Sequence, residues 1–72
     1  MTIENIEHIN ERYCLISGYR DGLFHAVAYD GKRPLKSIDA DELNAVNSYE
    51  QLRKWLLNVV DDAKIVIARK EK

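Results

Sequence analysis

The sequence has few of the residues that build cross-links or membrane segments. Its 72 residues include one cysteine, Cys14, so an internal disulfide cannot form, which fits a reducing cytoplasm. No apolar run approaches the ~20 residues that span a bilayer, and the N-terminus lacks the basic and apolar regions of a signal peptide. We therefore expect one small cytoplasmic domain over residues 1–72, with no membrane association.

An excess of charge of one sign is also missing, since the formal net charge is −1. Phosphate binding draws its affinity from clustered lysine and arginine, so this balance weakens a nucleic-acid interpretation. Four basic residues still gather around two predicted turns: Arg20, Lys32, Arg33 and Lys36. They keep a double-stranded nucleic-acid-binding module open as an alternative, with these side chains on phosphates and sheet aromatics stacked on bases.

Residues suited to catalysis or metal binding are scattered along the chain. His8, Cys14 and His25 do not share the spacing of a metal site, and the three glycines do not form a phosphate-binding loop. A reactive thiol needs an electropositive, partly open site, and Cys14 is predicted to be a buried structural residue. We predict a protein that is not an enzyme, with no catalytic residue, cofactor or metal.

Two Asp-Gly pairs, Asp21-Gly22 and Asp30-Gly31, divide the middle of the chain into strands. An Asp-Gly pair favours a two-residue hairpin because a type I′ turn needs positive φ at both positions. The pattern predicts strands over 13–20, 23–29 and 35–39, arranged as an antiparallel meander. With a two-residue first turn, position 20 opposes 23 and position 16 opposes 27.

The segments outside this meander are less uniform. Residues 3–12 predict a short helix or, because its isoleucines are β-branched, an irregular strand. Pro34 predicts irregularity where the third strand begins. Residues 39–47 fit either a helical turn or a loop, and the apolar run 65–68 predicts a short final strand.

The segment 49–61 predicts an amphipathic helix, with Ser48 as its N-cap. Its apolar positions follow the i, i+3, i+4, i+7, i+8 pattern: Leu52, Trp55, Leu56, Val59 and Val60. We therefore predict an α+β fold, a three- to four-stranded antiparallel meander packed on this helix, with a short N-terminal helix as an optional addition.

Both faces of the first hairpin are substantially apolar. One face carries Cys14, Ile16, Gly18, Leu23, His25, Val27 and Tyr29, and the other carries Tyr13, Leu15, Ser17, Tyr19, Phe24, Ala26 and Ala28. A helix covers one face, and the other is then an exposed apolar surface suited to contact with a partner. The sequence alone leaves open which face is covered.

Three blocks of the sequence resemble small phage-encoded anti-CRISPR inhibitors of the type I-F surveillance complex. They are Tyr13-x-x-Ile16-x-x-Tyr19-x-Asp21-Gly22, then Asp30-Gly31-Lys32, then Ser48-x-Glu50-Gln51-Leu52-x-x-Trp55, and they lie within residues 13–56. The resemblance implies an antiparallel sheet with helices and no enzymatic activity. It also implies binding to the complex's backbone subunits along the guide RNA, which blocks access of target DNA.

Carried over by position, the resemblance assigns Tyr19 to the contact with the complex, and Tyr13 lies on the same strand face. Cys14, Ile16 and Gly18 would then face the helix. The predicted function is a protein-binding module that inhibits by steric occlusion, with a host protein or protein–RNA complex as partner. A small regulatory or adaptor subunit that forms a homodimer through the sheet is a further alternative. The predicted partner-binding residues are Tyr13, Tyr19, Arg20, Phe24, Lys32 and Arg33.

Overall fold

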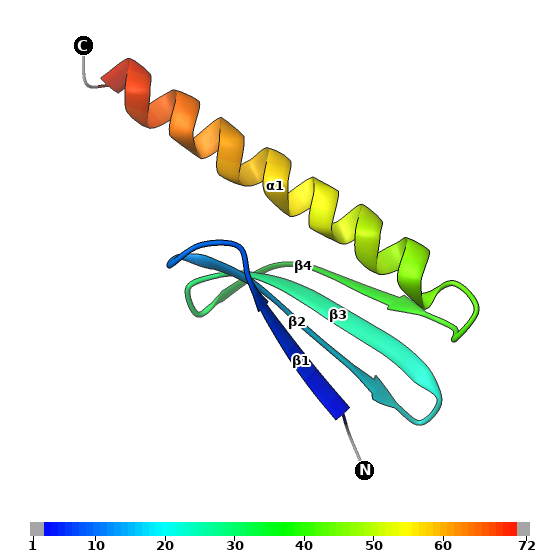
Figure 1. Ribbon diagram of the computed structural model, residues 1–72. Coiled ribbons are helices and arrows are strands. Elements are labelled where there is room, and N and C mark those ends of the chain that lie inside the picture. The colour runs from blue at the N-terminus through cyan, green and yellow to red at the C-terminus, as the bar shows by residue number, and fades with distance from the viewer. Residues whose placement is uncertain (1–2, 71–72) are drawn as a thin grey trace.

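Four antiparallel strands are followed by one long helix (Figure 1). The computed structural model describes the backbone of residues 3–70 and the side chains of residues 4–64. The strands are β1 (Ile3–His8), β2 (Tyr13–Arg20), β3 (Leu23–Asp30) and β4 (Arg33–Ala40), and the helix is α1 (Ala45–Lys70). The strands lie in the order β1-β2-β3-β4 with α1 on one face of the sheet, which confirms the predicted α+β fold.

The two turns next to the Asp-Gly pairs set the register of the central strands. Asp21 and Gly22 both have positive φ, 53° and 79°, as a type I′ turn requires. Arg20 pairs with Leu23, and this confirms the predicted register of the first hairpin. The pairing of β3 with β4 shifts register next to Tyr29, which pairs with the proline at 34, so the predicted irregularity is also confirmed.

The first segment is a strand and not the short helix. Residues 3–8 pair with β2 in regular antiparallel register, from Ile3 opposite Tyr19 to His8 opposite Cys14. Asn10 then closes the turn, because its side-chain Oδ1 accepts hydrogen bonds from the backbone N–H groups of residues 12 and 13 at 2.8 and 2.9 Å. The three-residue spacing of the isoleucines fits a helix, but an unpaired β2 edge and β-branched side chains favour a strand.

The helix begins four residues before the predicted start. Asn44 is the N-cap, since its carbonyl oxygen accepts the first helical hydrogen bond from Ser48 N–H at 2.9 Å. The side chain of Asp41 in turn accepts a hydrogen bond from the Asn44 N–H at 2.9 Å. The predicted N-cap role of Ser48 is therefore wrong, and the ambiguous stretch 39–47 contains the end of β4, a turn and the start of α1.

The helix also continues past residue 61, so the predicted final strand at 65–68 is wrong. No proline or glycine lies between Ala45 and Lys70, and only these residues strongly break a helix. A run of β-branched residues lowers helix propensity only slightly, and tertiary context overrides such preferences. At about 39 Å, a helix of this length is longer than the ~27 Å of an eight-residue strand, and its C-terminal part extends past the sheet (Figure 1).

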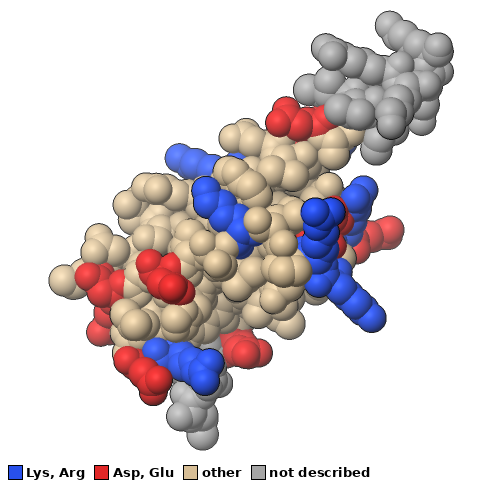
Figure 2. Space-filling view, turned by 180° about the vertical axis from the view of Figure 1, so that it is seen from behind, with Lys and Arg blue, Asp and Glu red and all other residues tan. Residues whose placement is uncertain are grey.

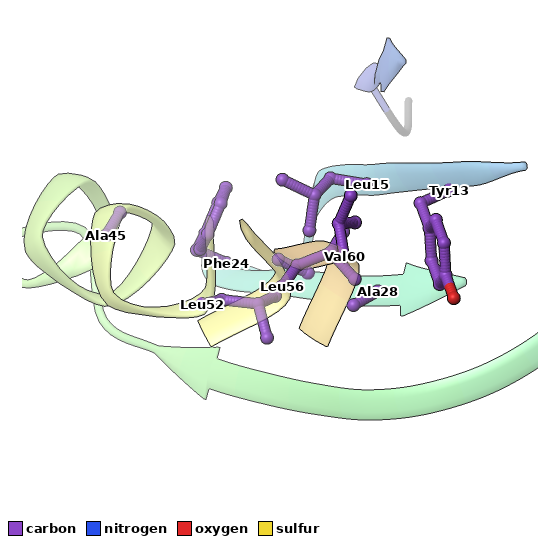
Figure 3. Close-up of a cluster of buried hydrophobic side chains, with 9 residues drawn as sticks. Tyr13, Leu15, Phe24, Ala28, Ala45, Leu52, Leu56 and Val60 are labelled. Carbon is purple, nitrogen blue, oxygen red and sulfur yellow. The ribbon is translucent and has the colours of Figure 1, made fainter. Parts of the chain in front are cut away.

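The core lies between α1 and the two central strands (Figure 3). Leu15 of β2 packs with Leu52 and Leu56 of α1, and these three are the largest fully buried side chains. The small residues Ala26 and Ala28 of β3 let α1 approach the sheet closely. The predicted helix stripe is confirmed: Leu52, Leu56 and Val60 are buried, while Trp55 and Val59 are partly buried beside them.

The covered sheet face is opposite to the one that the resemblance implies. Cys14, Ile16 and Gly18 point away from the helix, and the alternate residues of β2, starting at Tyr13 and Leu15, point toward it. Both faces are apolar enough to be covered. The presence of alanine on one side of β3, where the other side carries larger residues, favours the observed choice because a helix packs best on a surface without large protrusions.

Leu56→Ala tests this core. Removing a fully buried leucine side chain costs about 2–5 kcal/mol, which is enough to unfold much of a domain this small. Leu43 is 95% exposed, so Leu43→Ala is the matched control and should change stability by less than about 0.5 kcal/mol. Denaturant unfolding followed by circular dichroism measures both; equal midpoints for the two variants would contradict the described core.

Candidate functional site on the uncovered sheet face

Within residues 3–70, nothing covers the sheet face that points away from α1 (Figure 1). We call it the open face. Strand pairing brings its residues into rows across the sheet, because directly paired residues share a face. Its residues are Glu4, Ile6, His8, Cys14, Ile16, Gly18, Arg20, Leu23, His25, Val27, Tyr29, Ser37 and Asp39.

An apolar strip runs across the middle of the open face. Ile6, Ile16 and Val27 lie side by side on β1, β2 and β3. Ile6 is 59% exposed, and Ile16 and Val27 are half-buried although no second layer covers them. Tyr29 lies next along β3 on the same face, and Leu23 at the other end of that strand is 47% exposed. The strip therefore joins apolar residues from three strands.

A shallow hollow of about 400 Å³ lies beside this strip, above Gly18. Glycine has no side chain, so its place in the row between Glu4 and His25 is empty. The Nδ1 atom of His25 hydrogen-bonds to the carboxylate of Asp39 on β4, and this contact holds the imidazole at one side of the hollow. The hollow is open and bordered by both acidic and basic side chains, including Arg20.

The open face does not bring a nucleophile and a base together. Cys14 pairs with Tyr29, whereas His25 pairs with Gly18, four residues further along β2 and about 13 Å away. Cys14, predicted to be a buried structural residue, is half-buried on the open face, outside the core. In the described part of the chain, no group of three or more histidine, cysteine or carboxylate side chains is placed to hold a metal ion.

Two of the predicted contact residues lie in the core. Tyr13 is 6% exposed and Phe24 is 8% exposed, both beneath α1 (Figure 3). Their predicted place on an outward face is wrong because the helix covers that face. Large aromatic side chains bury the most apolar surface, and a domain of this size needs them in its core.

Tyr19 is the predicted contact residue that remains exposed, at 41%. It lies on the helix side of β2, and its ring centroid is 5.3 Å from that of Phe24. It lines a groove between β1 and the first half of α1, together with Asn5, Glu7, Val46, Tyr49 and Arg53. Tyr19 thus belongs to a second surface on the helix side of the sheet, and Ile6 at the β1 edge borders both surfaces.

The predicted basic contact residues are exposed but do not form one patch. Arg20 lies at the first hairpin turn, whereas Lys32 and Arg33 lie at the turn between β3 and β4, at the other end of an eight-residue strand, about 24 Å away. Lys36 lies on the helix side, with its Nζ 5.2 Å from the ring centroid of Trp55. In the view of Figure 2, lysine and arginine occupy several separate positions among acidic side chains.

A polar network that sequence reasoning missed fastens β1 to the helix. Glu7 accepts hydrogen bonds from the Tyr49 hydroxyl at 2.6 Å and from Arg53 Nε at 2.7 Å. These two bonds lower the pKa of Glu7, and burial together with the bond to Glu7 raises the pKa of Tyr49. In the sequence, the one signal for this network is the alternation of side chains along a strand at residues 3–8, because such a strand places Glu7 on the same face as Leu15, toward the helix.

Glu7→Gln tests the network. The folded-state pKa of Glu7 lies below its usual value of 4.5, so the ionised carboxylate stabilises the fold above that value. This stabilisation is lost as pH falls through the lowered folded-state pKa. We expect Glu7→Gln to cost about 1 kcal/mol at pH 7, with the difference from wild type shrinking at acidic pH.

The control is Glu4→Gln, which makes the same chemical change on the open face of the same strand. Its stability at pH 7 should stay within about 0.5 kcal/mol of wild type. Thermal unfolding of wild type and of both variants at pH 7 and at pH 3 gives the difference in stability of each variant from wild type. A pH-independent difference between Glu7→Gln and wild type would show that the carboxylate charge does not stabilise the fold.

Comparison of the chain with models of protein families, with curated proteins and with solved structures finds no match. Among the residues that the structure describes, no helix combines the length and the hydrophobicity needed to cross a bilayer.

Proposed function

We propose that this chain is a non-enzymatic protein-binding module that docks through the open face and acts by covering its partner's surface. The observation that carries this proposal is the apolar strip of Ile6, Ile16 and Val27. The helix packs on the opposite face of the sheet, and no layer within the described residues covers the face that carries the strip (Figure 1). Four strands of about six residues make a face on the order of 400 Å². The apolar strip takes up part of that face and is rimmed by polar residues, an arrangement that marks interaction sites on small proteins.

The composition of the open face supports a protein partner. An apolar centre with a polar rim is the usual anatomy of a protein–protein interface. Here the strip is the centre, and Glu4, Arg20 and the His25–Asp39 pair form the rim. Tyr29 adds an aromatic side chain of the kind enriched at such interfaces. The dispersed basic residues do not favour the nucleic-acid alternative, because phosphate binding needs them together.

The resemblance to type I-F anti-CRISPR inhibitors suggests the partner to test. The proposed action is steric: the bound domain would cover a surface of the surveillance complex that target DNA needs. This role requires no catalytic group, which is consistent with the separation of Cys14 from His25. It places the partner in the cytoplasm, as the single cysteine suggests.

Val27→Glu is the first test. The substitution places a carboxylate in the apolar strip, so it should weaken binding to the purified type I-F surveillance complex at least tenfold. Val46→Glu makes the same change at an exposed site on α1 and should leave binding unchanged. Biolayer interferometry measures both affinities, and circular dichroism verifies folding. If the wild-type domain does not bind, the proposed target is wrong; equal affinity of the two variants would reject the open face.

Tyr19→Ala separates the open face from the groove beside α1. Truncating a central aromatic of an interface typically costs ~2 kcal/mol or more, which is about thirtyfold in affinity. Because Tyr19 lies on the helix side of β2, docking through the open face predicts less than a threefold effect in the same binding assay. A thirtyfold loss for Tyr19→Ala together with full binding by Val27→Glu would move the docking site to the groove.

A further inference from the structure

The two edges of the sheet differ in their protection against further strand pairing. A free strand edge presents unpaired N–H and C=O groups, and proteins block it with proline, lysine or a bulge. The β4 edge has all three, in Pro34, Lys36 and the register shift beside Tyr29. The β1 edge has none of these three, since residues 3–8 contain no proline or lysine and pair with β2 without a shift, and its carboxylates are those of Glu4 and Glu7.

The helix also leaves β1 uncovered. The α1 backbone packs over β2, β3 and β4, and it reaches β1 through the side chain of Glu7. The outer edge of β1 is therefore open along its length within the described residues, with Ile6 59% exposed at its centre. An open, regular edge of this kind accepts another strand.

We propose that β1 pairs antiparallel with β1 of a second copy of this chain, so that the two meanders join into one continuous sheet. In a pair related by a two-fold axis perpendicular to the sheet, the same face of both copies lies on the same side, and residues that lie opposite each other share that face. Only registers in which one residue lies opposite its own copy meet this condition. Centring on Ile6 places Glu4 opposite His8 of the second copy, and His8 opposite Glu4. It also places Asn5 opposite Glu7 twice and Ile6 opposite itself.

The other registers are less complementary. Centring on Asn5 places Glu4 opposite Ile6 and Glu7 opposite Ile3. Centring on Glu4 or on Glu7 places two identical carboxylates against each other, which is destabilising. The register centred on Ile6 alone pairs acidic residues with a histidine or an amide and keeps an apolar contact on the axis. This self-complementarity is the reason for choosing another β1 as the second strand.

The arrangement has a geometric consequence for the open face. The two-fold axis is perpendicular to the sheet, so both helices lie on one side and both open faces on the other. The apolar strips then join through the two copies of Ile6 into one strip of double length. The inference is independent of the proposed function, since an isolated β1 edge would remain open whatever the open face binds.

Sedimentation equilibrium of the full chain from micromolar to near-millimolar concentration tests the pairing. Wild type should dimerise, and Ile6→Lys should raise the dimer Kd at least tenfold because it places two ammonium groups together on the axis. The matched control is Ile16→Lys, the same change in the same row but on β2, and it should still dimerise. A monomeric wild type, or a dimer that Ile16→Lys breaks and Ile6→Lys does not, would overturn the proposal.

A mixing experiment tests the register. His8→Glu alone places the introduced carboxylate opposite Glu4 in both pairs and should raise the dimer Kd about tenfold, whereas Glu4→Lys alone removes the acidic partner of His8 and should weaken the dimer less. In a mixture of the two variant chains, the introduced lysine lies opposite the introduced glutamate and one wild-type pair of Glu4 and His8 is kept, so native mass spectrometry should show the heterodimer as the main species. Both substitutions are at exposed sites, so the fold is kept. Statistical mixing, with homodimers as abundant as the heterodimer, would overturn the register centred on Ile6.

Discussion

A single helix against four strands is the constraint from which the other features follow. An α-helix is about 10 Å wide with its side chains, whereas four strands span about 19 Å. The helix α1 can therefore cover only part of one sheet face. It packs over the centre through Leu52 and Leu56, where Ala26 and Ala28 admit it. Within the described residues, the other face and the outer strand β1 stay uncovered (Figure 1), and the two proposed docking surfaces are there.

The sequence predicted those parts of the fold that local chemistry determines. The Asp21-Gly22 turn needs positive φ at two positions, which sets the register of β2 and β3. The spacing of Leu52, Leu56 and Val60 specifies one helix face in the same local way. Both patterns depend on residues that are close in sequence, so they predict structure without information on tertiary contacts.

The failures occurred where tertiary contacts decide. Isoleucines at 3, 6 and 9 fit a helix, yet pairing with β2 makes this segment a strand. Ile65 and its neighbours favour a strand, yet no breaker stops the helix before them. The two faces of the first hairpin were equally apolar, so the sequence did not determine that Tyr13 and Phe24 belong to the core. The candidate site is consequently the open face with its aliphatic strip, and not the face that carries these aromatic residues.

The network around Glu7 also determines where the native state opens. Residues 4–8 of β1 include no buried side chain, and two kinds of contact hold this segment: the hydrogen-bonded ladder to β2 and the bonds from Glu7 to Tyr49 and Arg53. Segments with few apolar contacts unfold locally at a free energy well below that of the whole domain. The first strand can therefore detach while the three-strand sheet and its helix remain folded, which would uncover the edge of β2. Local unfolding of this kind requires that both hydrogen bonds of one carboxylate break.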